Sequence, residues 1–259
     1  MVKPFSVAFF DLDGTVYIEG SLLPEIKKEL NLFQESGVEI YYLSNNTSVS
    51  RDSYHEKLKR LNIPVHRDCM ITPVVPLSKW IKQKKIKTFF CVGTDDFVFE
   101  LEKLSGAIND PYNPAIVIIA NDTELSFAKL TKACEHINLN VPLYATHIDL
   151  NCPSKKGPMP DCGAIISLLE TATKKICNGH FGKPSEYLVD TIKDILGDRR
   201  DFLVAGDRIY TDVNFGLKLG AVTLLVGTGE FDYKTDSKEI PKRAIYEHSL
   251  AEYLLKLRS

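Results

Sequence analysis

The order of apolar and polar positions along the chain predicts strands that alternate with amphipathic helices. Runs of β-branched, aromatic and aliphatic residues recur, and each is followed by a turn and by about a dozen residues of helical periodicity. Towards the two ends, strands are predicted at 7–10, 38–43, 202–205 and 222–226, and helices at 24–36, 50–61, 186–196 and 212–219. Apolar strands that alternate with helices indicate a parallel sheet covered by helices on both faces.

The middle of the chain repeats this pattern. Strands are predicted at 88–92, 115–120 and 141–145, and helices at 96–104 and 124–136. We interpret this region as a second, smaller α/β unit inserted between the two halves of the first. Prolines near residue 74 and glycines near residue 180 are typical of the connections that such an insertion requires.

The sequence Asp11-Leu12-Asp13-Gly14-Thr15 follows directly after the first predicted strand. Carboxyl ends of parallel strands lie at the edge of the sheet where open α/β folds bind ligands. Of two carboxylates in one such loop, one can attack phosphorus and the other can transfer protons at the bridging oxygen. Because carboxylates repel phosphate, this chemistry needs a cation, and oxygen ligands suit Mg²⁺. The alternative interpretation is an acidic surface turn.

The second strand ends in a further polar turn, Leu43-Ser44-Asn45-Asn46-Thr47. Its hydroxyl, its amides and the backbone N–H groups of such a turn can bind an anion. A helix N-cap formed by Asn or Thr is the alternative.

Two later segments add a lysine and two further acids. Lys183 stands between Gly182 and Pro184, and one ammonium group there can neutralise phosphoryl oxygens. Asp207 follows the strand at 202–205 and is placed to bind a metal ion. Asp212 either accepts hydrogen bonds from the metal ligands or from water and so orients them, or it caps the next helix.

In this order, the four segments resemble the haloacid dehalogenase-like hydrolase superfamily. The family pattern is D-x-D-G-T, a Ser or Thr after the second strand, a lysine, and G-D-x-x-x-x-D. The wording DLDGT, LSNN, GKP and GDRIYTD is most similar to the branch of p-nitrophenylphosphatase, phosphoglycolate phosphatase and pyridoxal phosphatase. The resemblance implies an α/β fold: a Rossmann-like parallel-sheet core of residues 1–74 and 180–259 and an inserted, smaller α/β cap domain of residues 75–179.

The resemblance also implies a role for each motif residue. Asp11 is expected to be the nucleophile and Asp13 the general acid and base. The magnesium ion is expected to be held by Asp11, the backbone carbonyl of Asp13, and Asp207, with Asp212 behind them. The phosphoryl group is expected to contact Ser44, Asn45, Asn46 and Lys183.

Substrate selection is expected in the cap. His147 and Asp161 depart from the family pattern, in which Asn or Asp and Gly are common at these positions. Asp161 either meets a polar part of the leaving group or caps a helix. Asn151 and Cys152 lie where relatives contact their leaving groups, and we hypothesise that they help to select the substrate.

Composition and charge restrict the partners. The formal net charge is −2, so that no overall basic field attracts nucleic acid or an anionic membrane. The six cysteines are scattered, and the apolar run near the N-terminus is too short for a secretory signal or a membrane span, which favours a reducing cytoplasm. The expected partner is a small phosphorylated metabolite, and analogy with relatives suggests a homodimer formed through the cap.

We therefore predict a magnesium-dependent phosphatase that cleaves small phosphate monoesters through an aspartyl-phosphate intermediate. Asp13 favours a phosphatase over a dehalogenase, because an alkoxide leaving group needs a proton and a halide does not. A phosphotransferase or mutase of the same superfamily shares every motif and is one alternative. A non-catalytic binding protein that retains the fold is the other.

Overall fold

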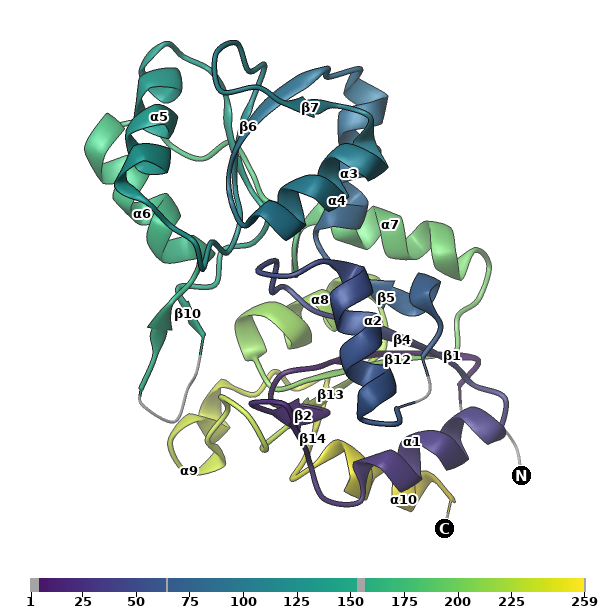
Figure 1. Cartoon of the computed structure of the whole chain (residues 1–259). Helices are drawn as coiled ribbons and strands as arrows, with labels where there is room; N and C mark the ends of the chain where they lie inside the picture. Colours follow the sequence, from purple (N-terminus) through teal and green to yellow (C-terminus); the bar gives the residue numbers. More distant parts are fainter. Residues whose placement is uncertain (1–4, 64, 153–156, 259) are drawn as a thin grey trace. The chain divides into compact units, whose positions relative to one another are not determined.

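The structure, a computed structural model, describes residues 5–63, 65–152 and 157–258 and divides the chain into two compact units (Figure 1). The first unit comprises the described residues of Met1–Ser44, Arg51–Ile71 and Val189–Ser259. The second comprises Asn45–Ser50 and the described residues of Thr72–Leu188. The domain boundaries expected after residues 74 and 179 stay a prediction.

The first unit is built on a six-stranded sheet in which all neighbouring strands are parallel. The strand order is β14-β13-β12-β1-β4-β5. The first strand of the chain, β1, therefore lies in the middle of the sheet, between β12 and β4. This confirms the predicted Rossmann-like parallel core. The strands are β1 (Val7–Asp11), β4 (Glu39–Leu43), β5 (Met70–Ile71), β12 (Phe202–Gly206), β13 (Val222–Val226) and β14 (Ala244–Glu247).

Neighbouring residues of β1 face opposite sides of this sheet, and both sides are buried. Phe10 belongs to a core cluster with Leu30, Leu58 and Leu254, which come from three different helices. On the other side, Phe9 stacks on Tyr41 with ring centroids 5.2 Å apart. A strand covered on both faces is apolar throughout. Residues 7–10 therefore show no alternation of apolar and polar side chains. The helices of this unit are α1 (Ile26–Glu35), α2 (Arg51–Arg60), α8 (Asn214–Leu219), α9 (Tyr233–Asp236) and α10 (Leu250–Arg258); α7 (Glu186–Leu196) continues into it from the second unit.

The predicted helix 212–219 differs from the structure at its start. A π-helical turn occupies Ile209–Val213, and α8 begins only at Asn214. Asp212 lies within the turn, where its carboxylate accepts the backbone N–H of Arg208 at 3.1 Å. Asp212 is therefore not the N-cap of α8, and that alternative is wrong. The chain also contains β5, β14 and α10, which the periodicity did not predict.

The second unit has a four-stranded parallel sheet of order β7-β6-β8-β9, with two helices on each face (Figure 1). Phe89 and Cys91 pack with α3 and α4, whereas Phe90 and Val92 pack with α5 and α6. The predicted α/β pattern of the middle region is thus confirmed. The elements are α3 (Val74–Lys84), β6 (Thr88–Val92), α4 (Asp95–Ser105), β7 (Ile108–Asn109), β8 (Val117–Ile119), α5 (Phe127–Asn138), β9 (Leu143–Ala145) and α6 (Cys162–Thr173).

Two small antiparallel strand pairs and two short 3-10 helices, Arg67–Cys69 and Ser237–Glu239, are also present. One strand pair joins β2 (Tyr17–Ile18) to β3 (Ser21–Leu22) in the first unit, and the other joins β10 (Asn151–Cys152) to β11 (Met159–Pro160) in the second. The predicted helix 124–136 begins later, at Phe127, because the Ser126 hydroxyl caps it by accepting the N–H of Lys129.

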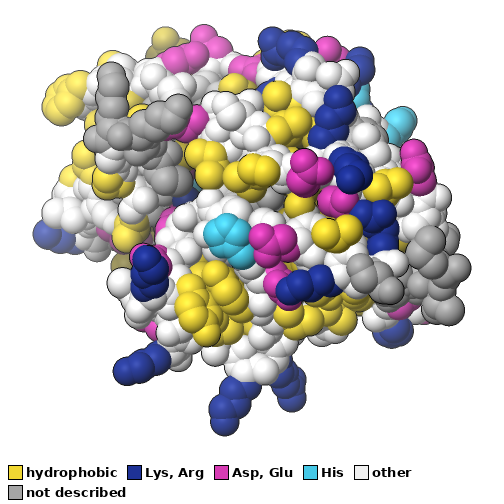
Figure 2. All heavy atoms as spheres, turned by 90° about the horizontal axis from the view of Figure 1, so that it is seen from below, with side chains coloured by type: hydrophobic (Ala, Val, Ile, Leu, Met, Phe, Trp, Pro, Cys, Tyr) yellow, Lys and Arg dark blue, Asp and Glu magenta, His cyan; other side chains and the backbone are white. Residues whose placement is uncertain are grey.

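Charges of both signs share the surface. On the face that Figure 2 shows, Lys and Arg side chains are interspersed with Asp and Glu, as the small net charge leads one to expect. Across the described ranges, helices with the length and apolarity of a membrane span are absent.

Candidate active site

Three carboxylates of the first unit converge where β1 and β12 end. Asp11 is the last residue of β1, Asp207 directly follows β12, and Asp212 lies in the π-helical turn after it. One oxygen from each lies within 4.8 Å of the others, and the side chains are almost entirely buried. Three carboxylates in so small a space repel one another, and a divalent cation bound by oxygen ligands would offset that repulsion. The donor set therefore fits Mg²⁺.

Three glycines make room for these acids, because a side chain at their positions would collide with the carboxylates. A Cβ on Gly229 would lie 2.0 Å from Asp207 Oδ2, and one on Gly14 would lie 2.5 Å from the same atom. Gly14 also has φ +88°, which glycine adopts at little cost. A Cβ on Gly206 would lie 2.2 Å from Asp212 Cγ. Glycine at these positions is a condition for the close approach of the backbone to the carboxylates.

The loop after β13 completes the surroundings of Asp207. The backbone N–H of Glu230 donates to Asp207 Oδ2 at 2.7 Å, and the Thr228 hydroxyl donates to the carbonyl of Gly14 at 2.6 Å. This loop was not among the predicted site segments. Its signal was present, since Gly227-Thr228-Gly229 directly follows an apolar predicted strand, as the other three core motifs do.

Asp13 is held by a tyrosine that was not among the predicted site residues. The buried Tyr17 hydroxyl donates to Asp13 Oδ2 at 3.4 Å, and the Lys57 ammonium lies 3.8 Å from the centroid of the Tyr17 ring. Burial, and next the charge of Asp13, raise the pKa of Tyr17 above its ordinary value, so that the hydroxyl remains a donor. Burial lowers the pKa of Lys57, and the charge of Asp13 opposes this shift. Asp13 is thus oriented by a neutral donor.

Ser44 is the last residue of the polar turn that belongs to the first unit. It is buried, its N–H donates to the carbonyl of Ile71 at 3.1 Å, and its hydroxyl lies 3.4 Å from that of Tyr54. The following helix α2 begins at Arg51, so neither Asn46 nor Thr47 is its N-cap. The N-cap interpretation of this turn is therefore wrong.

The next residues, 45–50, are fixed within the second unit by side-chain hydrogen bonds. The Thr47 hydroxyl lies 3.0 Å from that of Thr146 and accepts the N–H of Asn121, while Asp96 accepts the N–H of Ser50 at 2.7 Å. Asn46 Oδ1 accepts the N–H of Ser48 at 2.8 Å and thereby closes the turn.

Asn45 and Lys183 are hydrogen-bonded to each other in the second unit. Asn45 Oδ1 accepts the N–H of Lys183 at 2.8 Å, and Asn45 Nδ2 donates to the Lys183 carbonyl at 3.3 Å. Both residues are buried. A Cβ on Gly182 would lie 2.6 Å from Asn45 Oδ1, so glycine is required before the lysine. Of the predicted phosphoryl-binding residues, the structure thus brings these two together.

The two residues that depart from the family pattern lie next to each other. His147 Nε2 is 3.5 Å from Asp161 Oδ1, and His147 Nδ1 is 3.4 Å from Asp149 Oδ2. Asp161 is also the N-cap of α6, where its carboxylate accepts the N–H of Cys162 at 2.6 Å. The helix-cap interpretation of Asp161 is confirmed, and its pairing with His147 is an addition to it.

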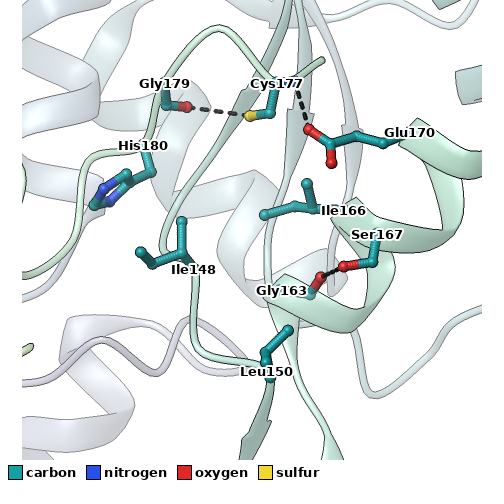
Figure 3. Close-up of a pocket in the computed structure, with 9 residues that line it drawn as sticks. All are labelled: Ile148, Leu150, Gly163, Ile166, Ser167, Glu170, Cys177, Gly179 and His180. Carbon is teal, nitrogen blue, oxygen red and sulfur yellow. Dashed lines mark hydrogen bonds between the residues drawn. The ribbon is translucent and has the colours of Figure 1, made fainter. Parts of the chain in front are cut away.

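A cavity of about 260 Å³ lies beside the start of α6 in the second unit (Figure 3). Ile148 and Leu150 line it from the loop before β10, and Ile166 and Glu170 line it from α6. Two of its polar side chains bond within the protein: Glu170 accepts the N–H of Cys177 at 2.8 Å, and the Ser167 hydroxyl donates to the Gly163 carbonyl at 2.8 Å. The residues that line it do not include the proposed selectivity residues: Asn151, which is exposed, and Cys152 lie in β10 instead. Their role in selectivity stays a prediction.

Comparison with known proteins agrees with these motifs. Residues 8–106 match the sequence model of a family described as haloacid dehalogenase-like hydrolase, and residues 180–253 match a second model described as HAD-hydrolase-like. The chain is 26% identical to 5'-nucleotidase YutF of Bacillus subtilis (strain 168), over 98% of this chain and 99% of the relative. It is 25% identical to an acid sugar phosphatase of Staphylococcus haemolyticus, over 95% of this chain and 93% of that one.

The fold is similar to that of solved structures. The crystal structure of a 4-nitrophenylphosphatase from Thermotoga maritima matches with a TM-score of 0.91 and 30% sequence identity. The match covers 98% of this chain and 97% of the other.

Proposed function

Because this chain belongs to the haloacid dehalogenase-like hydrolases and is a phosphatase of that family, we propose that it hydrolyses small phosphate monoesters with Mg²⁺ and an aspartyl-phosphate intermediate. The observation that carries the proposal is the convergence of Asp11, Asp207 and Asp212, with one oxygen of each within 4.8 Å of the others. Such a cluster of buried acids is costly to fold without a cation, and it suits catalysis at an anionic substrate.

In the first step, a carboxylate oxygen of Asp11 attacks phosphorus, and the bond from phosphorus to the ester oxygen breaks. Asp13 in its protonated form gives its proton to the departing oxygen, so the product is a neutral alcohol. The phosphoryl group is then covalently bound to Asp11. The donor hydroxyl of Tyr17 supports this role, because it holds the Asp13 carboxyl group in one orientation.

In the second step, Asp13, now a carboxylate, accepts a proton from a water molecule whose oxygen attacks phosphorus. The bond between phosphorus and Asp11 breaks, inorganic phosphate leaves, and both acids return to their starting forms.

Asp11 and Asp207 would hold the magnesium ion together with the backbone carbonyl of Asp13, and Asp212 would orient its ligands. When bound, the ion neutralises negative charge on the phosphoryl oxygens and on the carboxylates. The Lys183 ammonium would add a second positive charge for those oxygens, while Ser44 and the backbone N–H groups of Asn45 and Asn46 would donate hydrogen bonds to them. Buried Asn45 supports this assignment, because it fixes the backbone of Lys183 on both sides.

The names of the relatives point to phosphate esters of sugars and nucleosides as the first substrates to test. We propose that the second unit acts as the cap and selects among them by contacts of Asn151 and Cys152, the residues of β10, to the leaving group.

The experiment that tests the proposal is phosphate release from a panel of phosphomonoesters, measured with Mg²⁺ and with EDTA. The panel comprises p-nitrophenyl phosphate, sugar phosphates, nucleoside monophosphates and phosphoglycolate. The wild type should release phosphate only with the metal, and Asp11→Asn should release none. Asp198→Asn, which removes an exposed carboxylate of the same unit, serves as the matched control and should retain activity. Metal-independent release, or full activity of Asp11→Asn, would contradict the mechanism.

A further inference from the structure

His147 is an entirely buried imidazole between two buried carboxylates, and the proposed reaction does not use it. The exposed fractions of His147, Asp149 and Asp161 are 0%, 4% and 5%. Among the described residues, neither ring nitrogen of His147 has a hydrogen-bond partner, although each faces one carboxylate oxygen at 3.4 or 3.5 Å. A neutral imidazole carries only one N–H, so its second nitrogen would direct a lone pair at a carboxylate. The imidazolium presents an N–H to both.

The first carboxylate connects His147 to the lysine of the GKP motif. Asp149 Oδ2, the oxygen nearest to His147 Nδ1, also accepts a hydrogen bond from Asn45 Nδ2 at 3.2 Å. Asn45 in turn bonds both the N–H and the carbonyl of Lys183. The carboxylate of Asp149 therefore orients the Asn45 amide, and this amide fixes the position of the Lys183 backbone.

The second carboxylate cannot move away easily. Asp161 caps α6, and its own N–H donates to the carbonyl of Leu150 at 3.1 Å. The N–H of Gly163 donates to the Asp149 carbonyl at 2.8 Å, and a Cβ on Gly163 would lie 2.4 Å from the carbonyl oxygen of Ile148. The loop and the helix start are thus joined closely, and Asp149 and Asp161 both stay near the imidazole.

Removing the imidazolium would take away the positive charge that lies between two buried carboxylates. Breaking a buried ion pair on one side is strongly destabilising, because the remaining charge has lost its compensation. A metal ion explains the arrangement less well. It would bind one ring nitrogen only and would leave the other nitrogen facing the second carboxylate.

We propose that His147, as an imidazolium paired with both Asp149 and Asp161, is a positioning residue for the phosphoryl-binding pair of Asn45 and Lys183. It holds Asp149 in the orientation that accepts the Asn45 amide, and it makes the negative charge of the Asp161 helix cap tolerable in the interior. The link to substrate rests on the proposed role of Lys183. The pairing of His147 with Asp161 does not.

A double-mutant cycle tests the pairing. The variants are His147→Asn, Asp161→Ser and the two combined; serine keeps the helix cap but removes its charge. His147→Asn should lower the melting temperature. Asp161→Ser should lower it in the wild-type background but raise it in the His147→Asn background, where it removes a buried carboxylate that has lost the facing imidazolium. Melting temperatures that change by equal amounts in the two backgrounds would overturn the pairing.

The positioning role is tested by kinetics on p-nitrophenyl phosphate with Mg²⁺ and by the inhibition constant of inorganic phosphate. For His147→Asn we expect KM and the phosphate inhibition constant to rise about tenfold, with a smaller change in kcat. The double variant should recover part of the loss. Unchanged phosphate affinity in a folded His147→Asn protein would overturn the positioning role.

The matched control is His136→Asn, which changes the other deeply buried histidine of the second unit. His136 is 5% exposed and its Nε2 lies 3.0 Å from the Pro111 carbonyl oxygen, without a carboxylate pair. It should lower the melting temperature and leave KM unchanged. If His147→Asn does not fold, the double variant should still fold, and its failure to do so would overturn the pairing. A wild type that cleaves no ester would refute the proposed function, while the thermal cycle would still decide the pairing.

Discussion

Replacing Gly229 by alanine would place a methyl group where the Asp207 carboxylate lies. The added Cβ would be 2.0 Å from Asp207 Oδ2 and 2.5 Å from Asp207 Cγ. Real Cβ atoms essentially never come closer than 3.0 Å to such neighbours, so the gap must open by at least 1.0 Å, the difference between 3.0 and 2.0 Å. The φ of Gly229 lies outside the left-handed region. The effect is therefore steric, and backbone strain adds nothing to it.

The displacement has two consequences. It draws Asp207 Oδ2 away from the N–H of Glu230, which now donates to it at 2.7 Å. A hydrogen bond to a charged group contributes about 1.5–3 kcal/mol, so the folded state should lose stability of that order. It also misplaces a proposed metal ligand by about 1 Å, an error that costs on the order of 100-fold in rate.

The assay is kcat/KM for p-nitrophenyl phosphate as a function of Mg²⁺ concentration. Gly229→Ala should need more Mg²⁺ for half-maximal activity and should lose about two orders of magnitude in kcat/KM at saturation. Gly220→Ala is the control in the same unit: its Cβ would meet nothing within 4 Å, but its φ is +75°. It should lose stability through backbone strain and keep its Mg²⁺ dependence. A Gly229→Ala enzyme with the wild-type Mg²⁺ dependence would refute the role of Asp207 as a ligand.

Two further predictions concern the second unit. Phe181→Ala should lower the free energy of unfolding by about 3–5 kcal/mol, because Phe181 is fully buried against Trp80 and Tyr187. Urea unfolding measures this change. The control is Phe127→Ala, which alters a side chain that is 85% exposed and should change the free energy of unfolding little. Burial raises the pKa of the Cys162 thiol to about 12. Because the folded state then holds this proton more tightly than the unfolded chain, with its thiol pKa of about 8.5, the stabilisation is complete below that value and decreases as the pH rises above it. At pH 9.5 the wild type should have lost about 1.4 kcal/mol more than Cys162→Ala, relative to pH 7. Equal pH dependence of the two proteins would show that Cys162 ionises freely in the folded state.

The local pattern of the chain was enough to predict the strands that precede the catalytic motifs and three strands of the second sheet. The run at 7–10 is apolar at every position because both faces of β1 are covered, and such a run is visible in any sequence. The short strand β5 and the edge strand β14 were not predicted. β5 has only two residues, and β14 is only partly buried, so neither shows a clear periodic signal.

The candidate acids could also be found from the sequence, since each core motif follows a predicted strand and parallel strands present their carboxyl ends at one edge. What the sequence could not show is which neighbours hold them. Tyr17, four residues after Asp13, was missed because nothing in its position indicates that its hydroxyl points back. Gly229 was missed because the need for glycine there comes from Asp207, which is 22 positions away along the chain.

Sequence by itself thus determined the fold class, the order of the motifs and the kind of chemistry, because these depend on residue type and on spacing along the chain. Only the tertiary structure decided that Asp212 joins Asp11 and Asp207 and does not cap a helix. It alone decided that the segment 45–50 is hydrogen-bonded into the second unit and that His147 lies between Asp149 and Asp161. The physical reason is that burial and pairing of charge depend on distances between residues far apart in the chain, which no local pattern encodes.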